Sequence, residues 1–151
     1  MTMSYSIVLG VTGSIAAYKA VEVVSSLIKQ GNHVTVIMTS NAQRFVNPVT
    51  FQSISKNRVI TDLFIDTGNY DPNHISLAEN ADIVIVAPAT ANFIGKVVSG
   101  IADDALTCTI MAVRSPVIIA PAMNDSMYLN PIVQENIKKL KKLGYVIIEP
   151  E

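Results

Sequence analysis

Runs of consecutive apolar residues alternate with helix-like segments along the chain. Short runs rich in β-branched residues predict strands at 5–11, 33–38, 82–87, 116–120 and 145–149. Their interiors are continuously apolar, as in the Ile-Val-Ile-Val run at 83–86, which is typical of strands covered on both faces. The pattern therefore predicts a parallel sheet between two helical layers.

The segments between these runs carry signals for helix ends. Residues 14–30 predict a helix closed by Gly31, and Asn130, followed by a proline, predicts the N-cap of a helix that ends before Gly144. A further short strand is expected near residues 58–61. Strands that alternate with helices indicate an α/β fold, a doubly wound three-layer parallel sheet of the Rossmann or flavodoxin-like type.

Length and composition restrict the classes of protein that this chain fits. With 151 residues, 50% of them hydrophobic, the chain is expected to form one domain, 1–151. A formal net charge of -1 offers no basic face for nucleic acid, and the apolar runs are too short to span a membrane. Cys108 is the single cysteine and no secretory signal opens the chain, so a reducing cytoplasm is expected.

The first strand-to-helix junction, residues 10–19, reads GVTGSIAAYK. Its glycines allow close backbone approach, and the amides and hydroxyls that open the helix favour a phosphate, so Gly13, Ser14 and Ile15 are candidate cofactor-binding residues. The GxxG spacing is weak support for a dinucleotide, and Thr39 and two further small polar residues follow the second strand where a nicotinamide site prefers an acidic residue. We therefore predict a mononucleotide such as FMN; close helix packing is the alternative role of Gly13.

Two more small and polar loops follow the third and fourth predicted strands. Because ligands of open α/β sheets bind beyond the carboxyl ends of the strands, these loops and the first one are expected to line one crevice. The candidate cofactor-binding residues in them are Ala89, Thr90, Ala91, Asn92 and Met123. Asn124, between two methionines, is the candidate substrate-binding and catalytic residue, since its amide can hold a small polar group.

Each of these polar residues also has a structural alternative. Thr90 or Asn92 can cap the helix that follows, and Asn124 can cap the segment after its proline turn. His74 follows a turn-rich stretch and precedes a short helical segment. A lone histidine is a weak candidate for catalysis on its own, although its pKa near neutrality suits acid/base work. No metal site is expected.

These segments resemble the homo-oligomeric flavin-containing cysteine decarboxylases over nearly the whole chain, and most closely their coenzyme A branch. The resemblance is carried by residues 10–19, by His74, by a PASANT-like motif at 88–93 with 95–104, and by a PxMNxxMW-like motif at 121–128. Thr90 stands where the family often has serine and Tyr128 where it often has tryptophan. Both departures keep the chemical type.

The resemblance implies FMN as cofactor, 4'-phosphopantothenoylcysteine as substrate and 4'-phosphopantetheine as product. Unaided loss of carbon dioxide would leave a carbanion, so the thiol is first oxidised to a thioaldehyde, which accepts the electrons as an enethiol forms. By analogy His74 is an acid/base or orienting group at the flavin and Asn124 holds the substrate's carboxylate and amide. The family also implies a fused or separate phosphopantothenate–cysteine ligase as partner.

Homo-oligomerisation, as a trimer or a dodecamer of four trimers with the flavin at a subunit boundary, follows mainly from the resemblance. The sequence supports it through apolar residues in a loop-helix region with little reason to be apolar if solvated: Phe45, Val46, Val49 and Phe51.

Family members usually continue into a flexible clamp over the substrate, with a cysteine in the coenzyme A branch, whereas this sequence ends at Glu151. Either the sequence is a trimmed version of a longer protein, which the end just after a strand favours, or this branch does without reduction. Cys108 is not expected to replace the clamp cysteine, because residues 106–111 are typical of the apolar face of a helix.

Three alternatives to this function stay open. In the lantibiotic branch the enethiol of a peptidyl cysteine is itself the product. A flavin prenyltransferase shares the fold and the first loop, and an FMN-binding regulatory subunit would be non-catalytic. His74 and the motif at 121–128 favour the decarboxylase over the last two.

Overall fold

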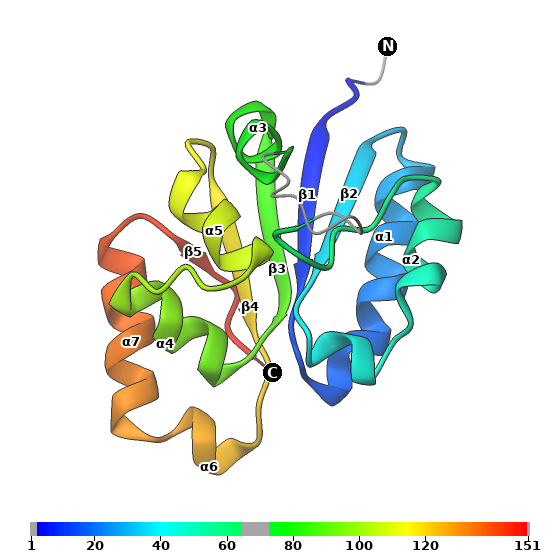
Figure 1. The fold of residues 1–151 in the computed structure, drawn as a ribbon. Coiled ribbons are helices and arrows are strands. Elements are labelled where there is room, and N and C mark those ends of the chain that lie inside the picture. The colour runs from blue at the N-terminus through cyan, green and yellow to red at the C-terminus, as the bar shows by residue number, and fades with distance from the viewer. Residues whose placement is uncertain (1–2, 65–72, 151) are drawn as a thin grey trace.

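The computed structural model describes residues 3–64 and 73–150, with Asn73 and His74 described by their backbone alone. One 5-stranded parallel sheet, in the order β2-β1-β3-β4-β5, forms the centre of the molecule (Figure 1). Its strands are β1 (Ser6–Val11), β2 (His33–Met38), β3 (Ile83–Ala89), β4 (Val117–Pro121) and β5 (Val146–Ile147). This is the flavodoxin-like order, and it confirms the predicted doubly wound α/β fold.

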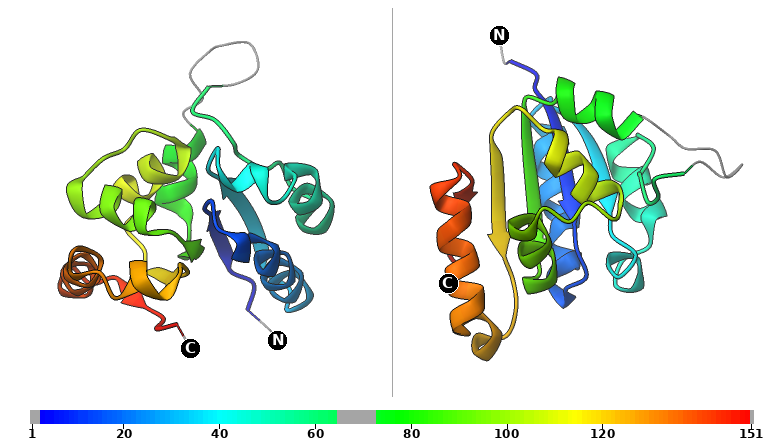
Figure 2. Two further views of the ribbon diagram at one scale, coloured as in Figure 1. Left: turned by 90° about the horizontal axis from the view of Figure 1, so that it is seen from below. Right: turned by 60° about the vertical axis from the view of Figure 1, so that its left-hand side comes forward.

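Helices cover the two faces of the sheet in separate layers (Figures 1 and 2). The layer of α1 and α2 encloses an apolar cluster that contains Leu9 and Phe51, and the opposite layer of α3, α4, α5 and α7 encloses a second cluster around Ile94 and Leu106. The described helices are α1 (Lys19–Lys29), α2 (Pro48–Ser55), α3 (Asn73–Asn80), α4 (Ala91–Ser99), α5 (Ala105–Ala112), α6 (Asp125–Tyr128) and α7 (Pro131–Lys142), with 3-10 helices at Ile15–Tyr18 and Ala42–Arg44.

The predicted helix ends are confirmed. The helix expected at 14–30 begins as a 3-10 helix capped by the Ser14 side chain and continues as α1, and Gly31 follows it with φ 90°, where a side chain would be strained. The Asn130 side chain accepts a hydrogen bond from the Ile132 amide at 2.9 Å and so caps α7 as predicted. Gly144, with φ 98°, lies just beyond the end of α7.

Two predicted strands are shorter in the structure. The run expected at 145–149 pairs with β4 only over Val146–Ile147, at the edge of the sheet. Near 58–61, Ile60 forms an isolated parallel bridge with Ile37 rather than a strand.

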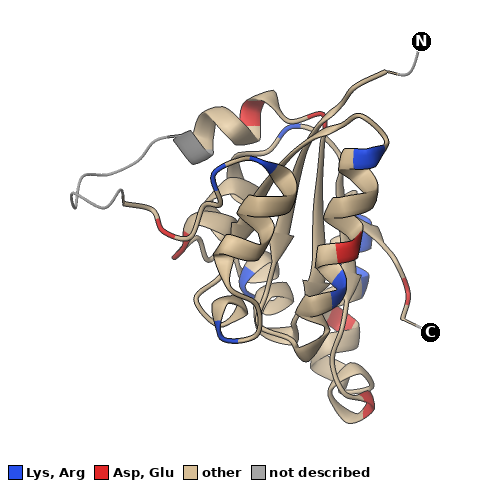
Figure 3. Ribbon diagram, turned by 90° about the vertical axis from the view of Figure 1, so that its right-hand side faces the viewer, with Lys and Arg blue, Asp and Glu red and all other residues tan. Residues whose placement is uncertain are grey.

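Among the described residues no helix has the length and apolar character to cross a bilayer. Basic and acidic residues are interspersed in the view of Figure 3.

One face of the sheet is only partly covered. Leu9, Ile85, Ile118 and Val146 are neighbours in register across four strands and therefore share a face. Exposure increases along this row: Leu9 is 0% exposed, Ile85 and Ile118 are half-buried, and Val146 is 50% exposed. α1 and α2 lie over β1 and β2, so these strands are covered on both faces as expected (Figure 2). On β4 buried and half-buried residues alternate, so one of its faces is only partly covered.

α5 packs very closely against β1 at Gly10. A β-carbon added to Gly10 would lie 2.5 Å from Leu106 Cδ1 and 3.0 Å from Leu106 Cδ2. Leu106 is 1% exposed and has little room to move. An alanine at position 10 would therefore force Leu106 to shift, and glycine lets α5 approach the sheet this closely.

This contact predicts strong coupling between the two positions. Gly10→Ala should lower the free energy of unfolding by about 1–3 kcal/mol through overpacking, and Leu106→Ala by about 2–5 kcal/mol through the cavity that it leaves. In the Leu106→Ala background the cost of Gly10→Ala should nearly vanish, because the obstructing side chain is gone. Urea unfolding of the four proteins measures this, and additive costs would contradict the packing argument.

Candidate functional site

Loops from separate parts of the chain meet beyond the carboxyl ends of β1, β3 and β4. In a 2-1-3-4-5 sheet the chain leaves β1 toward one face and β3 toward the other, which opens a crevice between them. A pocket of about 950 Å³ lies there, a size that suits a mononucleotide with a small substrate. It is lined by residues 12–16, 39–41, 90–93 and 121–124 and by Lys96, Asp103, Asp104, Thr107, Met127 and Pro150.

The first loop passes very close to the end of β2. A β-carbon on Gly13 would lie 2.4 Å from the Asn41 β-carbon and 3.2 Å from its backbone carbonyl carbon. Gly13 therefore serves close packing, which was the alternative role considered for it, but it packs against a loop rather than a helix. Ser14 caps the following 3-10 helix by accepting the Ala16 amide at 3.1 Å.

The end of β2 supplies hydroxyl and amide groups to the same part of the pocket. The Thr39 amide donates to the Val11 carbonyl at 3.1 Å, and Thr39 Oγ1 accepts the Ala42 amide at 3.2 Å. These bonds leave the hydroxyl proton of Thr39 able to donate to a ligand. Ser40 and Asn41 line the pocket beside it, so hydroxyl and amide groups stand where a dinucleotide site would place a carboxylate.

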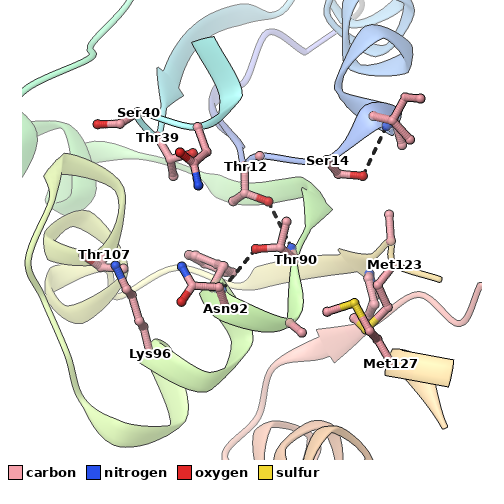
Figure 4. A pocket seen from close by; sticks show the side chains of 18 of the residues that line it. Thr12, Ser14, Thr39, Ser40, Thr90, Asn92, Lys96, Thr107, Met123 and Met127 are labelled. Atoms are coloured by element: carbon pink, nitrogen blue, oxygen red, sulfur yellow. Dashed lines mark hydrogen bonds between the residues drawn. The ribbon is translucent and has the colours of Figure 1, made fainter. Parts of the chain in front are cut away.

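The second loop combines capping with pocket lining. Thr90 Oγ1 accepts the Phe93 amide at 3.2 Å and caps α4, and both Thr90 and Asn92 line the pocket (Figure 4). Ala89, a predicted cofactor contact, is 0% exposed and is not among the lining residues. Its carbonyl instead accepts the Ala122 amide at 3.0 Å and so joins the second loop to the third.

The third loop presents Asn124 at the start of α6. Asn124 Oδ1 accepts a hydrogen bond from the Met127 amide at 2.8 Å. Asn124 is therefore the N-cap of α6, which was the structural role considered for it. The cap uses the oxygen and leaves the two N–H donors of the exposed side chain for a ligand. Met123 and Met127 form an apolar wall next to it (Figure 4). Capping and ligand binding are therefore compatible at Asn124.

A polar cluster fixes the third loop to the segment after β5. The Tyr128 phenol donates to Glu149 Oε2 and the Lys141 ammonium to Glu149 Oε1. The hydrogen bond from Lys141, and after it the one from Tyr128, holds the pKa of Glu149 below its usual value. The Glu149 carboxylate in turn raises the pKa of both Tyr128 and Lys141. The segment that Glu149 anchors brings Pro150 to the pocket wall.

A polar wall that no sequence pattern predicted lies on the side of the pocket away from the methionines. Lys96 Nζ lies 2.9 Å from Asp103 Oδ2, and this hydrogen-bonded ion pair lowers the pKa of Asp103. Asp104 and Thr107 form a capping box at the start of α5. An acidic pair directly before an apolar helix is a recognisable N-cap signal, but only the fold brings it to this pocket.

His74 lies in the first turn of α3, and its side chain is outside the described part of the structure. α3 contacts α5 and β1, and it lies beside the start of β1, at the end of the sheet opposite the pocket loops (Figure 1). None of the residues described in α3 lines the pocket. The role of His74 stays a prediction.

Comparison with known proteins assigns the chain to a family. The model of the family described as Flavoprotein matches residues 1–151. The chain belongs to this flavoprotein family. The flavoprotein is 50% identical over 151 residues to the coenzyme A biosynthesis bifunctional protein CoaBC of Borreliella burgdorferi, covering 100% of this chain and 38% of that relative. The chain thus spans about two fifths of this bifunctional protein.

Two other proteins are similar over most of their own length. A probable phosphopantothenoylcysteine decarboxylase of Streptococcus mutans is 44% identical over 151 residues, which covers 99% of the flavoprotein and 84% of the relative. The crystal structure of the FMN-dependent cysteine decarboxylase TvaF from thioviridamide biosynthesis has a TM-score of 0.91 at 32% identity, and the match covers 97% of this chain and 90% of that chain.

Cys108 of the flavoprotein is half-buried on α5, where its thiol donates to the Ala102 carbonyl at 3.3 Å. Burial, followed by the nearby carboxylates of Asp104 and Asp103, raises the pKa of the thiol. Because only the thiolate is an effective nucleophile, these surroundings make Cys108 less reactive. This agrees with the interpretation of Cys108 as a small hydrophobe.

We expect folded protein to react with iodoacetamide at least about 10-fold more slowly than urea-unfolded protein at the same mildly alkaline pH, because its thiolate fraction is smaller and its access is restricted. Mass spectrometry of the alkylated peptide over time measures both rates. Equal rates in the two states would show that the surroundings of Cys108 do not suppress its reactivity.

Proposed function

We propose that residues 1–151 form an FMN-dependent decarboxylase domain that acts on 4'-phosphopantothenoylcysteine. The proposal depends chiefly on one observation: the hydroxyl-lined first loop and the free amide donors of Asn124 face the same pocket. One end of that pocket suits a phosphate and the other a carboxylate. Membership of the flavoprotein family and the names of the relatives support it.

The residues present fit FMN. Ser14 and Thr39 supply hydroxyl donors, and Gly13 lets the first loop lie against Asn41 at the end of β2, so these residues would together hold the phosphate. Ala91, Asn92 and Met123 would contact the ring, together with Ile15 and Thr90. When bound, FMN supplies the two-electron oxidation of the substrate thiol that makes loss of carbon dioxide feasible and the reduction that follows it.

The substrate's own groups explain the remaining side chains. Asn124 would donate its amide hydrogens to the carboxylate and fix its orientation. The apolar wall of Met123 and Met127 opposes a charged carboxylate and favours its departure as neutral carbon dioxide. Two electrons leave the thiol and return to the enethiol, so the net change is loss of carbon dioxide and gain of a proton.

We further propose a ligase partner and a cytoplasmic location. The Borreliella burgdorferi relative is named as bifunctional, and the chain covers 38% of it, so a phosphopantothenate–cysteine ligase, fused or separate, would supply the cysteinyl substrate. A substrate with a free thiol persists in a reducing compartment.

A homo-oligomer, as a trimer or a dodecamer of trimers, is part of the same proposal. The apolar row from Ile85 to Val146 stays open on one sheet face, and a second copy could cover it. The sequence-based support is weaker than expected, because Phe51 is fully buried in the core and Val46 is partly buried beside it. Phe45 and Val49 are exposed as expected.

His74 gives a second reason for an oligomer. α3 and the pocket loops lie at opposite ends of the sheet (Figure 1). We therefore propose that His74 acts as the acid/base or orienting group in the pocket of another copy, which would make each site complete only at a subunit boundary.

A peptidyl-cysteine decarboxylase is the second candidate, favoured by the likeness to the solved structure of the peptidyl-cysteine decarboxylase EpiD, with a TM-score of 0.82 at 27% identity. The two functions differ in the substrate that is turned over, so the decarboxylation assay should include 4'-phosphopantothenoylcysteine and a peptide with a carboxy-terminal cysteine. If the protein binds FMN and turns over neither substrate, the assay would favour the non-catalytic regulatory subunit.

Purified protein is expected to be yellow with FMN bound noncovalently, and Ser14→Asp should weaken FMN binding about tenfold or more, because a carboxylate would face the phosphate. Fluorescence titration of the apoprotein with FMN measures this. Ser14→Ala is the matched control, since it removes the cap hydroxyl without adding charge. FAD or NAD in the extract, or unchanged affinity in Ser14→Asp, would contradict the assignment.

Asn124→Asp is expected to leave FMN affinity near normal while decarboxylation falls about 10²- to 10⁴-fold. Aspartate caps a helix as well as asparagine does, so α6 should persist, but its charge would oppose the substrate carboxylate. His74→Asn should lower decarboxylation over the same range. Asn130→Asp, at the N-cap of α7 and outside the pocket lining, is the control. Full activity in either site variant would count against its role.

Co-expression of the Asn124→Asp and His74→Asn chains is expected to restore activity that neither variant has alone. In randomly mixed trimers about a quarter of the sites would combine an intact pocket with an intact histidine from the next copy. Carbon dioxide release by the mixed protein, with sedimentation to confirm the trimer, provides the measurement. Activity no higher than that of the separate variants would place His74 in its own chain's site or outside catalysis.

A further inference from the structure

Thr12 joins the first and second loops at the bottom of the pocket. The ladder between β1 and β3 ends at the pair Gly10 and Val86. Beyond it, Thr12 Oγ1 donates to the Pro88 carbonyl at 2.7 Å and accepts the Thr90 amide at 3.0 Å. The Thr12 amide donates to the same Pro88 carbonyl at 3.2 Å. Thr12 therefore holds the two strands together after their regular pairing has stopped.

The direction of the Thr12 hydroxyl is determined by its partners. A carbonyl oxygen can only accept, so the hydroxyl proton points to Pro88, and a backbone amide can only donate, so Thr90 uses a lone pair of the hydroxyl. Thr12 is 1% exposed, and water does not compete effectively for these bonds. The connection is thus a fixed one between residues 76 positions apart.

Both ends of this connection lead directly to residues that line the pocket. On one side, the Thr12 carbonyl accepts the Ser14 amide at 2.9 Å, next to Gly13. On the other side, Thr90 caps α4 and is followed by Ala91 and Asn92 (Figure 4). The separation between the residues suited to phosphate and those suited to the ring is therefore set at Thr12, where the hydroxyl makes two of the three bonds.

We propose that Thr12 is a positioning residue, whose hydroxyl fixes the distance between the phosphate loop and the Thr90–Asn92 segment and so holds the flavin ring in register with Asn124. This inference rests on the proposed FMN site. A merely structural hydroxyl would affect stability alone, whereas a positioning hydroxyl also affects how tightly and in which surroundings the flavin is held.

Thr109 is a matched control for Thr12. It is 0% exposed, and its hydroxyl donates to the Ala105 carbonyl at 2.7 Å within α5. It does not line the pocket. Thr12→Val and Thr109→Val each remove one buried hydroxyl with little change in shape, but only Thr12→Val removes bonds between the two loops.

The test uses apoprotein titrated with FMN, visible circular dichroism of the bound flavin, and decarboxylation at saturating FMN. Thr12→Val should weaken FMN binding about tenfold, change the flavin spectrum, and lower kcat about tenfold with KM within about twofold, because the ring is displaced from a substrate still held by Asn124. Thr12→Ser should restore FMN affinity and spectrum, and Thr109→Val should leave both unchanged.

Wild-type affinity and spectrum in Thr12→Val would overturn the inference while leaving the proposed function intact. Wild-type protein that binds no FMN would instead overturn the proposed function, and the inference with it. If Thr12→Val does not fold, Thr12→Cys takes its place, because a thiol is only a weak donor and acceptor; unchanged FMN affinity in that variant would overturn the inference equally.

Discussion

The pairing of β1 with β3 is the contact on which the site depends. Residues between them in sequence form α1, β2, α2 and α3, so the chain must return across the sheet to place Leu9 beside Ile85. Since the connections after β1 and β3 leave toward opposite faces, their loops separate at this one position. The crevice is therefore a result of strand order, and side chains only determine what it can hold.

The pocket is also where several helices begin. Ser14, Thr90, Asp104 and Asn124 are all N-caps, and all line it. α4 and α5, the two of these helices with eight or more residues, carry a partial positive charge at their N-termini, which favours an anion in the pocket without many lysines or arginines. A chain with a net charge of -1 can in this way offer a site for anions.

Sequence patterns predicted those features that depend on neighbouring residues. The strand positions, the Gly31 and Gly144 ends and the caps at Thr90, Asn124 and Asn130 depend on local propensities, and the structure contains them. Features that depend on distant contacts were less accessible. The burial of Ala89 and Phe51 and the partly open face at β4 depend on which helix lies over which strand. The position of Lys96 and Asp103 in the pocket depends in the same way on how α4 and α5 fold back over the sheet.

The long connection between β1 and β3 also bears on the order in which contacts form during folding. β1 can pair with β2 after closing a short loop, but Thr12 and Pro88 are 76 residues apart, and closing so large a loop has a higher entropic cost. On loop-closure entropy alone, the contact between Thr12 and Pro88 is expected to form after the pairing of β1 with β2. A ligand that binds only the finished pocket stabilises the native state as a whole, so supply of the cofactor would influence how much newly made chain reaches and keeps its folded form.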